Sequence, residues 1–523
     1  MSRIAPMLAA TLALTLAMPG LPRAEELRLG VSAEITSADP HFQSASPNNA
    51  LWRHLYEPLV GLSERGETVP ALASAWEQRS PTEWEFRLRD GARFSDGSPV
   101  RAEDVAFSLA RPLTIPNSPS SLAVHVRGIT AVEVVDAGRL RLRTERPEPL
   151  LLQNLAAIAI LSRKAAEGHG STEFATDPAV GLGSGSFRLV RWSPGQNWVL
   201  ERNPHASQPS PWTRVTFRPL PGNAARTAAL LAGDLDGIEQ VPTADLPRLR
   251  EDARFHVVSG VSTRLIYLQP DTARAVSPQV SGPDGEPLGE NPLRDLRVRR
   301  AVSLAIDREA LAERVMGGEA VPAGQFLPDG FFGTSPRLPP DRQDLAAARA
   351  LLAEAGWPRG FRLVIAGPNN RYVNDRGVLQ AVAQMLTRIG IRTEVQAEPF
   401  AVFIPRMVRQ EASMGLLGLA TVYGDAGRQI GGLAESYDTA SGSGNFNYLR
   451  YSNPVLDGMM AELRGTMDSA ARRALTARAS ELAIADLPVI PLYFQKASWA
   501  LRRGLTMQPH PAEYTLATSI QPE

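Results

Sequence analysis

The chain of 523 residues contains no cysteine. This absence excludes disulfide bonds, thiol catalysis and thiolate metal sites. Lysine is nearly as scarce, since only Lys164 and Lys496 occur and arginine supplies the remaining basic charge. Lys+Arg and Asp+Glu each number 55, so neither sign of charge is in excess. Nucleic-acid-binding proteins usually carry a basic excess, and we therefore expect no nucleic-acid partner.

Sequence motifs of several enzyme classes are also missing. There is no Gly-x-Ser-x-Gly, no glycine before either lysine and no His-Glu-x-x-His, which removes the signatures of a nucleophile elbow, a phosphate loop and a zinc protease. The seven histidines are scattered, with no pair at helical ligand spacing. The sequence therefore gives no positive evidence for an enzyme, and we expect no catalytic residue, no metal site and no cofactor. A periplasmic hydrolase stays a distant alternative, because paired carboxylates are recognised only in three dimensions.

The first two dozen residues resemble an export signal. Arg3 supplies positive charge, Leu8 to Met18 is apolar, Pro19-Gly20 breaks the run, and Ala24 precedes two glutamates. This order is typical of a secretory signal peptide, and it predicts a signal at residues 1–24 and a periplasmic protein. An uncleaved membrane anchor is the alternative, although the apolar run is short for a bilayer. Pro22 leaves the cleavage position open.

The hydrophobic pattern predicts a mixed α/β fold. Trp84, Phe86 and Leu88 alternate with charged residues, as in a half-buried strand. A strand at 361–365, a helix from Asn374 or Asp375 to 389 and a strand at 391–395 predict a crossover unit with parallel pairing. Residues 271–291 are rich in Pro, Gly and charge, and we interpret them as an exposed loop between lobes.

Several stretches, in the same order, resemble the family 5 extracellular solute-binding proteins, the group that binds dipeptides, oligopeptides and nickel. The longest runs from Trp84-Glu85-Phe86-Arg87-Leu88-Arg89-Asp90-Gly91 through Phe94-Ser95-Asp96-Gly97 to Val105. The others include Ser37-Ala38-Asp39-Pro40-His41, Tyr56-Glu57-Pro58-Leu59-Val60, Arg297-Val298-Arg299-Arg300-Ala301-Val302 and Tyr451-Ser452-Asn453-Pro454. Together they span nearly the whole chain that follows the signal.

The resemblance implies a bilobal periplasmic-binding-protein fold of type II, with a hinge between the lobes and the extra domain of the peptide-binding group. The expected division is 25–46, 183–265 and 486–523 for lobe I, 47–182 for the extra domain and 266–485 for lobe II. It also implies a monomer that holds a small peptide-like solute in the interlobe cleft and delivers it to the permease and ATPase of an ABC importer. A nickel or metal-chelate carrier of the same family is the alternative.

Three segments are candidates for ligand contact by this resemblance. In the first, Glu34, Ile35 and Thr36 would line the cleft, with strand-like hydrogen bonds to a peptide backbone. In the second, Asn370, Arg371 and Tyr372 follow a strand at its carboxyl end, where ligands of α/β sheets tend to bind. Arg371 would grip a ligand carboxylate through two hydrogen bonds.

The third candidate segment contains Leu419, Tyr423 and Asp425. Peptide binders of the family carry a tryptophan and, three residues later, an aspartate that pairs with the peptide amine. Here Leu419 and Val422 stand at these positions. The usual partner of an ammonium group is therefore missing. Asp425 or Glu34 would substitute for it, or the ligand has a blocked amine or is anionic.

Overall fold

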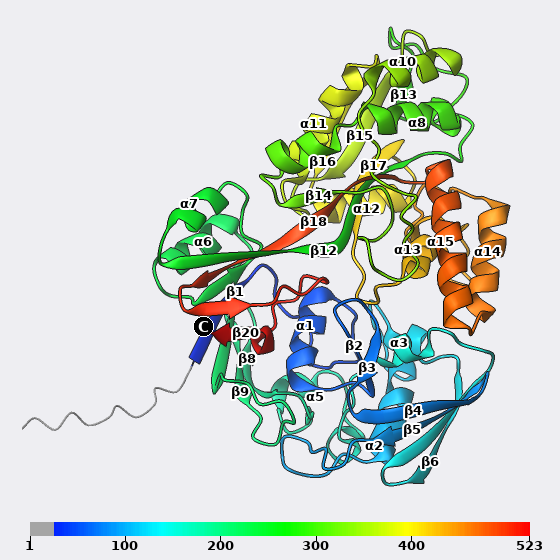
Figure 1. Ribbon diagram of the computed structural model, residues 1–523. Helices are drawn as coiled ribbons and strands as arrows, with labels where there is room; N and C mark the ends of the chain where they lie inside the picture. Colours follow the sequence, from blue (N-terminus) through cyan, green and yellow to red (C-terminus); the bar gives the residue numbers. More distant parts are fainter. Residues whose placement is uncertain (1–25) are drawn as a thin grey trace, which may run out of the picture.

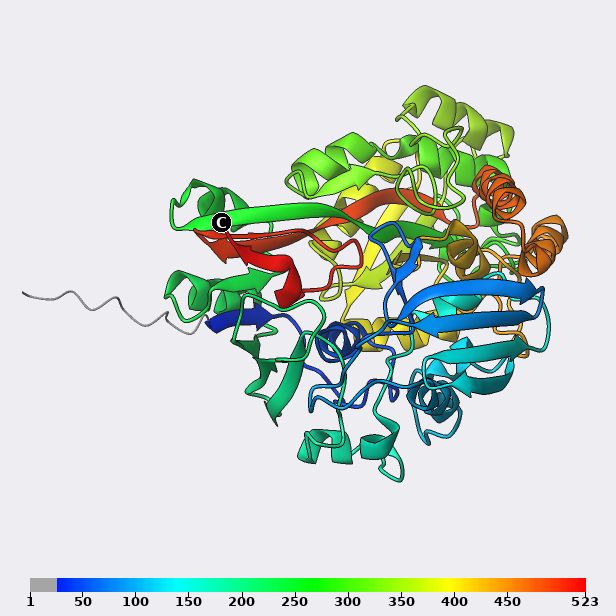
Figure 2. The same cartoon turned by 60° about the horizontal axis from the view of Figure 1, so that its bottom comes forward.

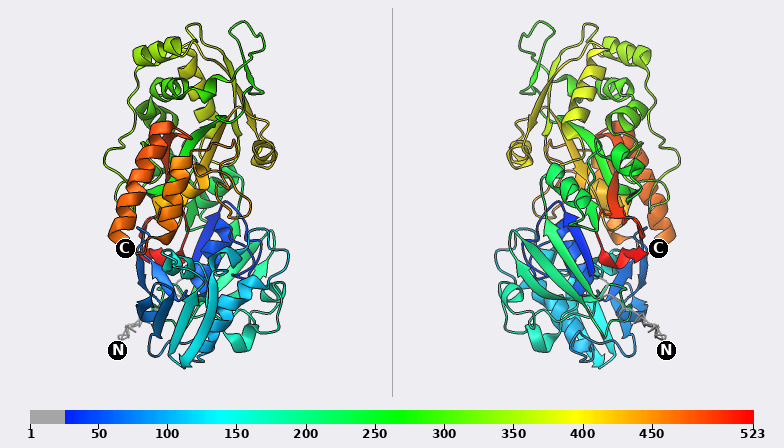
Figure 3. Two further views of the ribbon diagram at one scale, coloured as in Figure 1. Left: turned by 90° about the vertical axis from the view of Figure 1, so that its right-hand side faces the viewer. Right: turned by 90° about the vertical axis from the view of Figure 1, so that its left-hand side faces the viewer.

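The computed structural model describes residues 26–523, and the predicted signal peptide lies outside this range. The chain forms two parts stacked on each other (Figures 1 and 3). A large sheet extends through both parts. Its order is β13 (Val280–Ser281), β15 (Arg362–Pro368), β17 (Met414–Leu419), β12 (Phe255–Pro270), β18 (Ile490–Arg502), β11 (Gly237–Glu239), β1 (Glu26–Val31), β10 (Arg214–Pro219), β9 (Asn197–Arg202) and β8 (Phe187–Ser193).

Two long strands connect the parts. β12 and β18 contain 16 and 13 residues and pair antiparallel from Phe255 opposite Arg502 to Leu268 opposite Ile490. They run side by side across the molecule (Figures 1 and 2). From Leu265 to Pro270 every residue of β12 is buried, which is typical of a strand covered on both faces. We call β12 and β18 the crossing strands.

The upper part in Figure 1 contains the crossover unit that the sequence predicts. β15 and β16 (Arg392–Glu398) are parallel neighbours in the sheet, and α11 (Asp375–Thr387) connects them along the chain. Asp344 accepts a hydrogen bond from the amide of Ala347 and so caps α10. The other elements of this part are α8 (Leu296–Ala305), α9 (Arg308–Ala310), β14 (Ala320–Pro322), α10 (Leu345–Glu354), α12 (Phe400–Val408), α13 (Ala426–Leu433), α14 (Pro454–Gly465) and α15 (Ser469–Asp486).

The lower part combines the other half of the large sheet with a separate four-stranded sheet. In the latter the order is β4 (Ala73–Ser80), β5 (Glu83–Leu88), β7 (Arg139–Thr144) and β6 (Ile129–Asp136), and β6 and β7 form a hairpin. Phe86 of β5 is fully buried. The helices are α1 (Ser46–Leu55), α2 (Ala102–Ala110), α3 (Leu151–Leu155), α4 (Arg163–Ala166), α5 (Glu173–Thr176), α6 (Asn223–Leu231) and α7 (Leu246–Glu251).

The apolar core is divided into separate clusters. One lies under the four-stranded sheet, two lie around β1, β9 and β11, and two fill the upper part. The expected α/β, bilobal fold is confirmed. We expected the loop 271–291 to lie between the lobes, but it does not. Leu268 before the loop and Leu293 after it belong to the same core cluster of the upper part, so the loop begins and ends in that part. The expected domain boundaries stay a prediction.

Candidate functional site

A bulge interrupts the crossing strands where they pass from one part to the other. Residues 262–264 of β12 stand opposite the single residue Gln495 of β18, because the register shifts between Val261 and Leu265. Such a bulge turns side chains out of the regular ladder. Here it directs a charged side chain, Arg264, into a region bordered by both parts.

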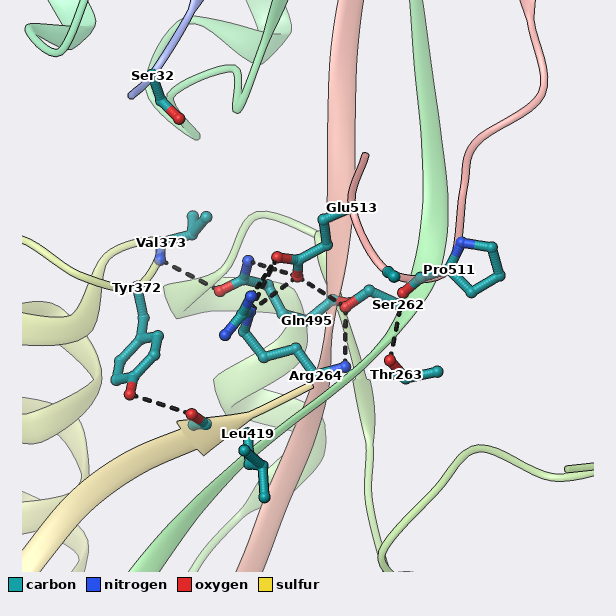
Figure 4. A network of polar contacts seen from close by, with 12 residues as sticks. Ser32, Ser262, Thr263, Arg264, Tyr372, Val373, Leu419, Gln495, Pro511 and Glu513 are labelled. Carbon is teal, nitrogen blue, oxygen red and sulfur yellow. Dashed lines mark hydrogen bonds and ion pairs between the residues drawn. The ribbon is translucent and has the colours of Figure 1, made fainter. Parts of the chain in front are cut away.

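Hydrogen bonds fix the bulge to segments from both parts (Figure 4). The Thr263 amide donates to the Pro511 carbonyl at 2.9 Å, and the Thr263 hydroxyl donates to the Thr421 carbonyl at 2.6 Å. The Ser262 hydroxyl donates to the carbonyl of Gln495 at 2.8 Å. The bulge therefore holds together the C-terminal segment, the loop after β17 and the crossing strands.

The bulge presents Arg264 to the carboxylate of Glu513. The Arg264 Nε donates to both carboxylate oxygens at 2.9 Å, and Nη2 donates to Oε2 at 2.6 Å. The two side chains are 12% and 10% exposed. Glu513 has a φ of +64°, a left-handed conformation that costs a non-glycine residue roughly 1–3 kcal/mol. Burial alone would raise the pKa of Glu513, but the Arg264 guanidinium reverses this and the pKa of the carboxyl is lowered.

The loop after β15 approaches this ion pair from the upper part (Figure 4). The Val373 amide donates to Oε1 of Gln495 at 3.2 Å, and the Tyr372 hydroxyl donates to the Gly418 carbonyl at 3.2 Å. The guanidinium of Arg371 lies over the ring of Phe400, 5.2 Å from its centroid. Arg371 is exposed and forms no ion pair within residues 26–523.

Two cavities adjoin at Arg264. The smaller cavity has a volume of about 110 Å³, and Arg371, Glu513 and Glu239 are among its lining residues. The larger cavity has a volume of about 1090 Å³, and it is lined from both parts of the molecule. Four residues line both cavities, namely Ser46, Arg264, Ala512 and Tyr514. Small-molecule sites commonly measure roughly 300–1,000 Å³, so the larger cavity has room for a solute of several residues.

Side chains from the two parts meet across the larger cavity. The hydroxyl of Tyr423 lies 3.2 Å from Nε2 of His125, whose Nδ1 lies 3.2 Å from Oδ1 of Asn154. Arg428 donates to the same Asn154 oxygen at 2.6 Å and lies over the Tyr423 ring at 4.1 Å. Burial, aided by the Arg428 charge, lowers the pKa of His125 to about 4. His125 is therefore neutral at neutral pH and joins the two parts as a polar contact.

The predicted segment 34–36 makes contacts within the lower part. The Glu34 carboxylate accepts hydrogen bonds from the indole of Trp192 and the amide of Gly195. Ile35 is 1% exposed and belongs to the core cluster around β1. The Thr36 amide donates to Oδ1 of Asn48 at 3.0 Å. None of the three is among the residues that line the two cavities.

The other predicted residues divide into two groups. Arg371, Leu419 and Tyr423 line the cavities. The Asn370 side chain instead accepts from the amide of Phe400. Tyr372 is 8% exposed within the core of the upper part. Asp425 is fully buried, caps α13 and pairs with Arg472 at 2.7 Å.

Sequence reasoning missed Arg264, Glu513, His125 and Arg428. One signal for Arg264 was present, because an arginine preceding an otherwise apolar run in a strand needs a partner. Nothing local distinguishes Glu513, which meets Arg264 from 249 residues further along the chain. His125 and Arg428 are likewise brought together only by the packing of the upper part on the lower one.

No group of three or more potential His, Cys, Asp or Glu metal ligands occurs within the part of the chain that the structure describes. A search of the same residues found no helix with the length and hydropathy needed to cross a bilayer.

Comparison with known proteins finds relatives that match nearly the whole length of the chain. The periplasmic murein peptide-binding protein MppA of Escherichia coli (strain K12) is 27% identical over 499 residues, which are 90% of this chain and 88% of MppA. The structure of MppA in its unliganded open form covers 96% of this chain and 98% of its own, with a TM-score of 0.75 and 25% identity. The periplasmic oligopeptide-binding protein OppA of the same organism is 24% identical over 522 residues, 94% of this chain and 91% of OppA.

A likeness in fold extends to NikZ from Campylobacter jejuni, whose structure in complex with Ni(L-His) has a TM-score of 0.75 and 20% identity over 95% of this chain and 97% of its own. The family described as bacterial extracellular solute-binding proteins, family 5, matches residues 67–441. This match covers well over half of the chain, so the protein belongs to family 5 of the bacterial extracellular solute-binding proteins.

Proposed function

We propose that this protein captures a peptide or peptide-like solute in the periplasm and delivers it to the permease and ATPase of an ABC importer. The observation that carries the proposal is the larger cavity of about 1090 Å³, lined from both parts of the molecule at the crossing strands. The relatives MppA and OppA, named for murein peptides and oligopeptides, support a peptide-like ligand.

The proposed mechanism is closure of the two lobes around the solute. Lobe I would consist of residues 25–46, 183–265 and 486–523, the extra domain of 47–182, and lobe II of 266–485. The crossing strands then provide the hinge. A ligand that touches both lobes only in the closed state favours that state by its differential affinity. Closure also removes water, which strengthens polar contacts to a charged solute.

Capture requires no bond to be made or broken in the solute. The expected solution state is a monomer, exported with the help of residues 1–24 and acting without a cofactor or a catalytic residue. The relatives are named as binding proteins, which supports a role limited to affinity and closure.

The test begins with the protein purified from the periplasm under native conditions. Mass spectrometry of the molecule released by denaturation should identify a peptide-like solute. The stripped protein should then gain thermal stability with that solute, as mass action requires. Nickel alone and nickel with histidine form the competing arm. A stabilisation by nickel–histidine and none by peptides would replace the proposal with the metal-chelate carrier, and product release from the peptides would replace it with a hydrolase.

A further inference from the structure

Eight arginines are among the residues that line the two cavities. Five of them form no ion pair with any carboxylate of residues 26–523, and these are Arg53, Arg127, Arg146, Arg371 and Arg428. Three more lining arginines are paired, namely Arg264 with Glu513, Arg464 with Glu435 and Arg472 with Asp425. The chain as a whole has no net charge, so this excess of positive charge is local to the cavities.

The carboxylates that line the cavities do not neutralise this excess. They are Glu239, Glu435 and Glu513. Glu435 and Glu513 are each engaged by an arginine that is not one of the five. Glu239 accepts hydrogen bonds from the amide and hydroxyl of Ser32 and from the hydroxyl of Thr515. It thereby connects the segment after β1 to the C-terminal segment.

Two of the five guanidinium groups are held in place by uncharged partners. Arg53 lies between the rings of Trp52 and Tyr514, at 4.3 and 4.7 Å from their centroids, and donates to the Asn49 carbonyl. Stacking on ring faces orients a cation without neutralising it. Arg428 is similarly held by the Tyr423 ring and the side-chain oxygens of Gln153 and Asn154.

The positive groups line two adjoining cavities. Arg371 lines the smaller cavity, Arg53 and Arg428 line the larger one, and Arg264 and Tyr514 line both. Like charges brought together in a confined region disfavour one another, and an anion that enters relieves the repulsion. A zwitterion with a single carboxylate would satisfy only one end of this space.

We propose that the solute is polyanionic, with at least two carboxylates separated along a peptide-like chain, and that its amino group is not required for binding. This inference rests on the proposed function and narrows it to acidic solutes. One carboxylate would meet Arg371 beside the Arg264–Glu513 pair, and another would meet Arg53 and Arg428 in the larger cavity. Arg127 and Arg146, both exposed, would add attraction at the entrance during approach.

The experiment compares two matched tripeptide libraries on the stripped mature protein, one built from Ala, Glu and Asp and the other from Ala, Gln and Asn, each with free and with acetylated amino termini. Thermal shift selects the tightest ligand of each library and calorimetry measures its affinity. We expect the acidic ligand to bind about 100-fold more tightly than its amide counterpart. We expect acetylation to change its affinity by less than about 3-fold, since no ammonium contact is lost.

Variants locate the effect. Arg53→Gln and Arg428→Gln should each weaken the acidic ligand about 10-fold and leave its amide counterpart within about 2-fold, because only a charge-assisted contact is removed. Arg342→Gln is the matched control, because Arg342 is exposed and lies outside both cavities.

Three results would overturn the inference. Equal affinity for the acidic and amide ligands would contradict the proposal of a polyanionic solute and would leave the proposed function unaffected. If no member of either library binds, both the polyanionic solute and the proposed function are contradicted. Binding of inorganic pyrophosphate, run as a separate arm, in the absence of binding by the acidic library would replace the carboxylates with phosphate.

Discussion

The guanidinium of Arg264 and the carboxylate of Glu513 meet in three hydrogen bonds of 2.6 to 2.9 Å at the bulge of β12. Neighbouring polar groups connect this ion pair to β12 and to the loop after β15. The Ser262 oxygen lies 2.9 Å from Oε1 of Glu513, and the side chain of Gln495, which stands opposite the bulge on β18, accepts from the amide of Val373. One ion pair thus borders the smaller cavity and is bonded to the crossing strands and the C-terminal segment.

Removal of one partner of this pair should destabilise the protein. Arg264→Met leaves the Glu513 carboxylate buried without its cation, at an expected cost of about 3–5 kcal/mol. Replacing both, in Arg264→Met/Glu513→Leu, should cost less than Arg264→Met alone, since no buried charge is left. Thermal unfolding of the three proteins measures this. If Arg264→Met unfolds at the wild-type temperature, the pair has no structural role.

Stability should also fall as the pH is lowered from 6.5 towards 4, and His54 is one cause. Its Nδ1 lies 2.7 Å from the Ala50 carbonyl and its Nε2 accepts from the Ala517 amide. Burial lowers the pKa of His54 from 6.5 to about 4. Between pH 6.5 and 4 the unfolded chain therefore binds a proton that the folded chain does not, and this lowers the free energy of unfolding. Above pH 6.5 the ring is neutral in both states and the full stability is present.

Unfolding midpoints measured at pH 7, 6, 5 and 4 test this assignment. His54→Asn should reduce the slope of stability against pH without abolishing it, because the buried His41 and the half-buried His125 and His510 also have pKa values lowered to about 4. An unchanged slope would show that His54 is protonated equally in both states.

The contact between Tyr423 and His125 should favour the closed arrangement. Tyr423→Phe removes the hydroxyl and keeps the ring under Arg428, so affinity for the co-purified solute should fall about 5-fold, the value of one hydrogen bond. Calorimetry measures the affinity, and Tyr437→Phe is the control, since Tyr437 is 43% exposed and lines neither cavity. Equal losses in both variants would contradict the assignment.

Arg371 should matter to binding and not to folding. Arg371→Ala should weaken a carboxylate-bearing solute by about 2–5 kcal/mol if the contact becomes buried on closure, with the unfolding midpoint unchanged because Arg371 forms no ion pair among the described residues. Arg376→Ala, an exposed neighbour on α11, is the control. Retention of full affinity by Arg371→Ala would remove this residue from the site.

The N-terminal sequence of the exported protein tests the predicted signal. We expect the mature chain to begin near Glu25, and a variant that lacks residues 2–24 to remain in the cytoplasm. An exported chain that retains its first residues and stays with the membrane would instead establish the anchor.

The sequence was most informative where the physics is local. The alternation at Trp84 and Phe86 and the crossover around α11 both depend on residues within a few turns of one another. The predicted site segments were less informative, because whether a side chain such as Glu34 points into a cavity or towards Trp192 depends on distant packing. Arg264 and Glu513 depend on contacts across 249 residues, which no periodicity records.

The position of β18 in the large sheet has a consequence for biogenesis. This strand lies between β12 and β11, yet it follows β1, β10, β11 and β12 in the chain and is therefore synthesised after all of them. Until residues 490–502 arrive, β1, β10 and β11 have no sheet partner that joins them to the upper half. The lower half must therefore wait in a partly assembled form, and this interval is when chaperones and proteases have their best access to it.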